Sequence, residues 1–513
     1  MTPTGSTSAA RVLLKGASWQ TLAQVAPLAL NLILTPIVYQ GLGVEAYGLF
    51  IVVNSIALAI GTFDGGIGAS AQRYFTIFAG RDARDEMTRL LVSLLGIVTL
   101  VSLVLFTGLW MVSPAVVRFF QASPAMQPEM TFLLRTMVVV VGVALVRQLF
   151  ACVLYSMQKF AIPSTTGLLG HAVYAAGMLW TVRSDLGLYG VAYTFMAQQV
   201  LSTVVIIPSA LRFLTPHGLR FVSRAEMKDF FGYAWKAQIA SVLEMLGLQG
   251  DTFIVGRFAP TQVGIFGPGS QFAFQLRSLP TNAVGAPMQA MIGRWVGEHG
   301  EEASLPRFER LQRLWVLFIS GWVAVGAPAC YFGVVEWLHI PTRLPGEVAA
   351  LALIGHFWPM LAVPTILWVL TLGRPELDMR YGLVNVSLNL SMTLAFIIPF
   401  GVLGSVAATV IAQLVAYLFL LRQIDRHLPS PPRSPLRDVP FLEMLCSGSV
   451  AYLCVYGVSL VIDAGYIPQG AVALLACGLA AAPAGILYVL LTVGPREIKE
   501  MLARRRSGRD LVA

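Results

Sequence analysis

EAYGLF at Glu45–Phe50 recurs as TQVGIF at Thr261–Phe266, 216 residues later, with glycine and phenylalanine in the same two places. The same offset aligns GASWQTLAQ, which begins at Gly16, with GYAWKAQIA, which begins at Gly232. A nearby offset of 214 residues aligns GLYG at Gly187–Gly190 with GVLG at Gly401–Gly404. A fixed spacing shared by several matches is the signature of an internal repeat. We therefore expect two structurally similar halves.

The composition is that of a membrane protein. Of the 513 residues, 56% are hydrophobic and 12% are charged, and the mean hydropathy is +0.72. Soluble domains carry about 25% charged residues. A helix needs about 20 apolar residues to cross a hydrocarbon core. We predict an all-α polytopic membrane protein with about 14 transmembrane helices, at 17–41, 47–70, 90–112, 131–152, 161–182, 187–210, 232–256, 262–284, 312–333, 347–372, 380–399, 402–422, 444–463 and 470–493.

The repeat divides these spans into two six-helix lobes. Because six is even, both lobes enter the membrane with the same polarity, which makes a parallel repeat about an axis along the membrane normal. Two C-terminal helices lie outside the repeat. The Pro-rich and Ser-rich connection that precedes them is typical of a flexible linker. The predicted parts are a cytoplasmic N-terminus (1–16), an N-lobe (17–210), an inter-lobe linker (211–231), a C-lobe (232–422), a cytoplasmic linker (423–443), spans 13 and 14 (444–493) and a basic cytoplasmic tail (494–513).

The distribution of Lys and Arg predicts the orientation. With a cytoplasmic N-terminus, 29 of the 35 basic residues fall on the cytoplasmic side and four on the other side. Basic residues concentrate in cytoplasmic connections, so both termini are predicted to be cytoplasmic. The same bias accounts for the net charge of +9. Basic clusters at the membrane suit anionic lipid headgroups, and we expect membrane lipids and no nucleic acid as partners.

Several classes of function are disfavoured. The five cysteines are scattered through apolar segments without a CxxC or Cys/His cluster, so we expect small core residues, no metal and no cofactor. No Walker sequence is present, so an ion gradient, the membrane potential or consumption of the product would drive transport. The longest predicted exterior connection, Ser113–Met130, has about 18 residues and no long loop holds a DxD pair. The sequence therefore favours a transporter over a membrane glycosyltransferase, a polymerase or another enzyme.

Three segments carry a resemblance to a known family. They are GLGVEAYGLFIVVNSIALAIGTFDGGIGASAQRYF (41–75), GDTFIVGRFAPTQVGIFGPGSQFAFQLRSLPTNAVGAPM (250–288) and GRPELDMRYGLVNVSLNLSMTLAFIIPFGVLGSVAATVIAQL (373–414). With its span count, the chain resembles a polysaccharide flippase, of the O-antigen or exopolysaccharide type, in the multidrug/oligosaccharidyl-lipid/polysaccharide exporter superfamily. These patterns of glycine, small and apolar residues specify the fold better than the substrate.

The resemblance implies two six-helix lobes around a central cavity and transport by alternating access. It also implies a cargo of lipid-linked oligosaccharide in the inner membrane of a bacterium. A polysaccharide polymerase and glycosyltransferases are then candidate partners. Lipid II flippases and multidrug or cation antiporters share the fold and remain alternatives. The first span lacks the Arg–Asp pair usual in lipid II flippases, which places that alternative second.

An isoprenoid-diphosphate cargo requires a polar cavity with cations for the diphosphate, because unpaired charges are costly in hydrocarbon. In the first span, Gln20, Gln24 and Asn31 fall within about 40° of one another around a helix. They are candidates for the cavity wall or for hydrogen bonds between helices.

The seventh span carries charged candidates on one face. Lys236, Glu244 and Asp251 are spaced by 8 and 7 residues, which places them within roughly 80° around a helix. Lys236, which aligns with Gln20 in the repeat, is a candidate to bind diphosphate or to extend to the headgroups. Glu244 is a candidate ion-coupling site, and Asp251 is a candidate for ion coupling or for capping a helix end.

The fourth span carries one arginine near each boundary. Arg147, at the cytoplasmic end, can bind phosphate in bidentate fashion or anchor the helix at the positive side of the membrane. Arg135 lies toward the exterior end and is a further cavity candidate.

The segment GTFDGGIGASAQRYF (Gly61–Phe75) predicts a cytoplasmic elbow in the first lobe. Asp64 lies close to the predicted boundary of the second span, and Gly65 and Gly66 loosen a helix. At offset 216 this site aligns with Pro280, which also disfavours a continuous helix. We therefore expect a helix break at Asp64, Gly65 and Gly66 and another at Pro280.

Overall fold

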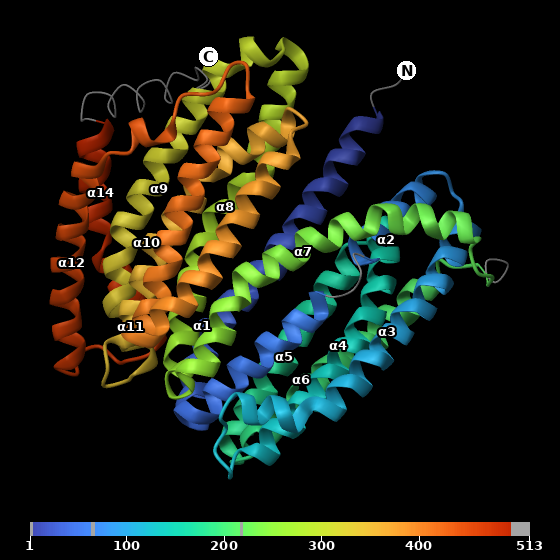
Figure 1. Cartoon of the computed structure of the whole chain (residues 1–513), viewed down its shortest axis with the longest axis horizontal. Helices are drawn as coiled ribbons and strands as arrows, with labels where there is room; N and C mark the ends of the chain where they lie inside the picture. Colours follow the sequence, from blue (N-terminus) through green and yellow to red (C-terminus); the bar gives the residue numbers. More distant parts are fainter. Residues whose placement is uncertain (1–3, 63–66, 158, 216–218, 494–513) are drawn as a thin grey trace. The chain divides into compact units, whose positions relative to one another are not determined.

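A computed structural model describes residues 4–62, 67–157, 159–215 and 219–493, with side chains from Leu30 onward except at some positions inside helices. The described chain consists of helices joined by short connections and holds no strand (Figure 1). Its α-helices are α1 (Thr4–Thr62), α2 (Ile67–Gly80), α3 (Arg84–Phe119), α4 (Gln127–Ser156), α5 (Ala161–Arg183), α6 (Gly187–Leu211), α7 (Arg224–Phe258), α8 (Val263–His299), α9 (Glu301–Leu338), α10 (Leu344–Thr371), α11 (Pro375–His427), α12 (Phe441–Asp463), α13 (Ala471–Ala480) and α14 (Ala482–Val493). Two short 3₁₀ turns, η2 (Pro260–Gln262) and η3 (Pro435–Asp438), join α7 to α8 and α11 to α12.

Nine helices of the described chain are long and apolar enough to cross a membrane. Two long helices each contain a non-helical glycine, Gly43 in α1 and Gly401 in α11, at which two predicted spans meet. The apolar side chains of α3 that face outward, such as Leu100 (62% exposed) and Val104 (63% exposed), have the surface expected of a helix in lipid. The all-α membrane fold is confirmed.

The chain divides into two compact units, Met1–Gly264 and Ile265–Ala513. In the first unit, α4 packs against α3 and α6, and α5 packs against α1 and α6. The seventh helix, α7, contacts α1 and α2 of this unit. The lobe boundary predicted at 211–231 stays a prediction, because contacts in one conformation do not define which helices move together.

The second unit is built on α9 and α10 (Figure 1). α10 packs between α9 and α11, while α12 and α13 pack on α9. Its core is aromatic: the rings of Phe308 and Trp368 stack with centroids 4.5 Å apart, and Trp315 Nε1 donates to the Met360 carbonyl at 2.7 Å. Both Phe308 and Trp368 are fully buried.

The glycine pattern of the repeat has the same structural role in both units. Gly187 begins α6 with φ 54°, and Gly401 begins the second part of α11 with φ 61°. A Cβ on Gly190 or Gly404 would lie closer than 3.0 Å to atoms of the preceding helical segment. The first glycine of each pair therefore provides a turn that other residues rarely adopt, and the second permits close packing.

The glycines of EAYGLF and TQVGIF contact each other. A Cβ on Gly48 of α1 would lie 3.0 Å from the backbone nitrogen of Gly264, at the start of α8. A Cβ on Gly264 would collide with the Val44 carbonyl oxygen. Only glycine on both segments allows this approach, which explains why the repeat keeps glycine at the two positions.

Candidate functional site

The helix that carries the charged candidates has a well-defined start. Ser223 caps α7: its hydroxyl accepts from Glu226 N at 3.2 Å, and the Glu226 carboxylate accepts from Ser223 N at 2.7 Å. The backbone hydrogen bond from Ser223 holds the pKa of Glu226 below its usual value. From this capping box α7 continues as one helix to Phe258, so its residues keep the helical spacing on which the prediction rests.

Part of the predicted polar face lies outside the described side chains. This applies to Gln20, Gln24, Lys236 and Glu244, whose proposed roles stay predictions. Asn31 on α1 and Asp251 on α7 are described and half-buried.

α7 is fixed to the end of α1 at the predicted elbow. Gln238 Nε2 donates to the carbonyl oxygen of Thr62 at 2.9 Å. Thr62 is the last residue of α1, where carbonyl groups lack partners within the helix. The next helix begins at Ile67, so Asp64, Gly65 and Gly66 fall between two helices and themselves lie outside the described residues.

The second predicted break is not found. Pro280 is buried inside α8, which continues from Val263 to His299. A proline removes the N–H that would bond to the carbonyl four residues earlier, here that of Leu276. Trp322 Nε1 of α9 donates to this carbonyl at 3.1 Å. The carbonyl group that proline leaves free therefore has a hydrogen-bond partner on a neighbouring helix, and α8 continues through Pro280.

Arg147 lies on α4 and faces α6. With the Gln199 amide oriented so that its oxygen faces Arg147, that oxygen accepts from Arg147 Nε at 3.2 Å. Among the described residues, no carboxylate lies within ion-pair distance of Arg147. A half-buried guanidinium with a neutral amide partner keeps donors for an anion.

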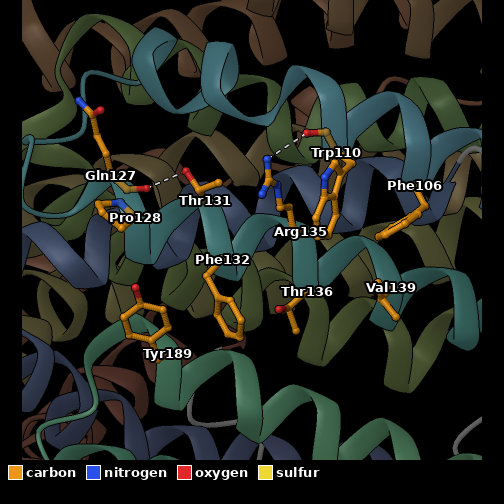
Figure 2. A pocket seen from close by; sticks show the side chains of 10 residues that line it. All are labelled: Phe106, Trp110, Gln127, Pro128, Thr131, Phe132, Arg135, Thr136, Val139 and Tyr189. Atoms are coloured by element: carbon orange, nitrogen blue, oxygen red, sulfur yellow. Dashed lines mark hydrogen bonds between the residues drawn. The ribbon is translucent and has the colours of Figure 1, made fainter.

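Arg135 lies elsewhere on the same helix. Twelve residues separate it from Arg147, about 18 Å along the helix axis. Its Nε donates to Ser113 Oγ at 2.9 Å, and Nη2 donates to the Trp110 carbonyl at 3.3 Å. Both partners belong to α3, and Figure 2 shows Arg135 beside Trp110 in a pocket between α3, α4 and α6. The two arginines therefore do not form one cationic site.

The segment between α11 and α12 is fixed to α9, although its composition is typical of a flexible linker. Gln312 Nε2 donates to the Arg433 carbonyl at 2.7 Å, and Thr365 Oγ1 donates to Gln312 Oε1 at 3.4 Å. Glu309 Oε1 accepts from Arg433 N at 2.7 Å. Composition could not reveal the two contacts of Arg433, because Gln312 and Glu309 lie more than 100 residues away from it in the sequence.

An apolar groove of about 690 Å³ lies between α9, α10 and α12 in the second unit. Its walls are aliphatic and aromatic, with Ser449 as the only hydroxyl besides that of Tyr452 among the lining residues. Leu445 and Leu453 of α12 are 69% and 66% exposed. The sequence identified α12 as a span, but not this groove, because a groove depends on how three helices pack.

A family model described as "Polysaccharide biosynthesis protein" matches residues 13–292, more than half of the chain. The chain belongs to this family. No curated protein sequence matches it.

The fold is also that of solved membrane transporters. The lipid II flippase MurJ, in an inward closed conformation, is similar with a TM-score of 0.72 and 13% identity over 95% of this chain and 100% of its own. An inward-facing multidrug resistance MATE family transporter of the MOP superfamily has a TM-score of 0.64 and 14% identity over 80% and 98%. A MOP superfamily transporter from Pyrococcus furiosus has a TM-score of 0.53 and 17% identity over 80% and 92%.

These identities show a shared fold. This member of the polysaccharide biosynthesis family therefore has the fold of the lipid II flippase MurJ and of a MATE family transporter of the MOP superfamily. The resemblance inferred from the three sequence segments is confirmed at this level.

Proposed function

We propose that the protein flips an isoprenoid-diphosphate-linked oligosaccharide from the cytoplasmic to the outer leaflet of a bacterial inner membrane, for surface polysaccharide biosynthesis. Transport proceeds by alternating access of two lobes around a cavity, without chemical conversion of the cargo. Family membership over residues 13–292 carries the proposal, because it couples this transporter fold to polysaccharide biosynthesis.

Two features of the structure meet requirements that such a cargo imposes. The diphosphate requires cations, and Arg147 has donors without a carboxylate partner in the described chain. The isoprenoid tail must stay in an apolar environment while the sugar crosses. The apolar groove between α9, α10 and α12 offers such a surface.

A lipid II flippase is the second candidate. The structural match to MurJ covers 95% of this chain, whereas the match to the MATE transporter covers 80%. The difference is about as long as the C-terminal segment from the linker to the end of α14. The missing Arg–Asp pair in the first span argues against this candidate. A multidrug or cation antiporter shares the fold but leaves the match to a polysaccharide family unexplained.

The decisive experiment measures flipping by the purified full-length protein in proteoliposomes. A fluorescent isoprenoid-diphosphate oligosaccharide is present in both leaflets, and an impermeant reductant quenches only the molecules in the outer leaflet. We expect the wild-type protein to move molecules from the inner to the outer leaflet, so that the reductant quenches them as well. Arg147→Ala and Lys236→Ala should each slow this exchange at least tenfold. In cells at matched expression, each should abolish export of the surface polysaccharide.

Arg212→Ala is the matched control, because Arg212 is an exposed cation at the end of α6, on the predicted cytoplasmic side. It should flip cargo at the wild-type rate. Wild-type rates for both cavity variants would overturn the cationic pathway. Wild-type protein that flips lipid II but not the oligosaccharide lipid would favour the second candidate.

A further inference from the structure

The pocket between α3, α4 and α6 has a polar end and an apolar end. It has a volume of about 490 Å³ and is lined by residues of these three helices. Gln127, Thr131, Arg135 and Val139 follow one another at four-residue steps on α4 (Figure 2), so they share one face of the helix. Gln127 lies at the helix start, and Val139 lies about 18 Å further along. Along α4 the lining of the pocket therefore changes from polar at Gln127 to apolar at Val139. This order matches a ligand with a polar end and an apolar end.

The polar half holds an uncompensated charge. No carboxylate of the described chain lies within ion-pair distance of Arg135. Its guanidinium lies over the Trp110 ring, 4.2 Å from the centroid. Nε and Nη2 donate to α3, whereas Nη1 makes no hydrogen bond within the described residues. A cation held in this way in a membrane-spanning segment favours an anion.

The pocket lies beside exposed apolar side chains, which is the kind of surface that a membrane helix presents to lipid. Trp110 is 46% exposed and Val139 is 42% exposed, and their neighbour Met111 on α3 is 76% exposed. Tryptophan and arginine near the end of a membrane helix are typical of the headgroup region. Aromatic side chains, including Phe106 and Phe132, form much of the remaining wall.

We propose that this pocket binds an anionic phospholipid of the surrounding leaflet. The phosphate pairs with Arg135, the polar headgroup lies toward Gln127 and Tyr189, and the first part of one acyl chain lies against Phe106 and Val139. A guanidinium group with a free donor pairs well with a phosphate, because charge-assisted hydrogen bonds of this kind are strong. The site is distinct from the proposed cargo pathway, since it uses neither Arg147 nor α7.

The test measures lipid binding to the purified full-length protein in neutral detergent by native mass spectrometry. The probes are phosphatidylglycerol, phosphatidylcholine and inorganic phosphate. We expect phosphatidylglycerol to bind at least tenfold more tightly than phosphatidylcholine. Arg135→Gln should remove this preference. Arg118→Gln is the matched control: Arg118 is an exposed cation near the same end of α3, outside the pocket, and its loss should leave the preference unchanged.

A second variant keeps the test valid if Arg135→Gln does not fold. Val139→Trp fills the apolar end of the pocket without removing a charge and should weaken phosphatidylglycerol at least fivefold. Equal binding of phosphatidylglycerol to wild type and Val139→Trp would overturn the proposal, as would an equal loss in Arg118→Gln. Inorganic phosphate that displaces the lipid at equal concentration would also overturn it, because the acyl chain would then contribute nothing.

Discussion

Pro280 shows how one residue can have opposite meanings in a sequence and in a packed protein. Within a helix it removes a donor and leaves a carbonyl free, which predicts a break. Here Trp322 supplies the missing donor to Leu276 from α9, 46 positions away. The carbonyl that proline leaves free is therefore satisfied by a tertiary contact that no local rule contains.

This explanation makes a quantitative prediction about Trp322. Trp322→Phe keeps an aromatic ring but removes the donor, and it should lower the free energy of unfolding by about 1 kcal/mol. In a Pro280→Ala background the restored N–H can bond to Leu276 within the helix, so the same change should cost much less. Thermal unfolding of the four purified proteins in one detergent measures this coupling. Equal costs in both backgrounds would show that the indole donor does not compensate for proline.

The candidate site could be predicted only in part from such residues. Arg147 and Arg135 stand out in the sequence because charges are rare in apolar spans, and the structure places both on α4. Their partners, Gln199 on α6 and Ser113 on α3, could not be predicted, since they depend on which helix faces come together. The roles of Lys236 and Glu244 stay predictions.

The length of an apolar segment predicts the position of a helix well where the helix ends at the membrane boundary. The span predicted at 161–182 is α5 (Ala161–Arg183), and that at 187–210 is α6 (Gly187–Leu211). α8 was predicted to end at 284 but continues to His299, and α9 was predicted from 312 but begins at Glu301. An apolar window detects only the part of a helix that is apolar, so polar extensions are missed.

The glycine that divides α11 provides a test of element structure. Gly401 has φ 61° and ψ −147°, a conformation open almost only to glycine. Gly401→Ala should therefore lower the free energy of unfolding by about 1–3 kcal/mol. Gly382 lies on the same helix, and a Cβ there would meet no heavy atom within 4 Å, so Gly382→Ala should be neutral or slightly stabilising. Thermal unfolding midpoints compare them, and equal midpoints would contradict a structural role for the positive φ at Gly401.

At the level of the complete chain, the repeat was the most informative feature of the sequence. It aligned Gly187 with Gly401, and both have positive φ values; it also aligned Gly48 with Gly264, whose backbones are in contact. Such positions preserve glycine for steric reasons, so their spacing survives when other residues diverge. Substrate identity leaves no comparable trace, because the same packing suits flippases and multidrug transporters.

The orientation of the whole chain rests on the distribution of 35 basic residues and can be measured directly. The native Cys446 is exposed and Cys454 is half-buried, so both are first replaced by alanine. Ser184→Cys then places a thiol in the exposed connection between α5 and α6, and Arg81→Cys places one between α2 and α3. We expect a membrane-impermeant maleimide to label Ser184→Cys in spheroplasts and Arg81→Cys only after the inner membrane is opened. The reverse labelling pattern would show that the termini face the exterior, and the proposed direction of flipping would then be reversed. Most basic residues would in that case lie on the exterior side, in contradiction to the positive-inside rule.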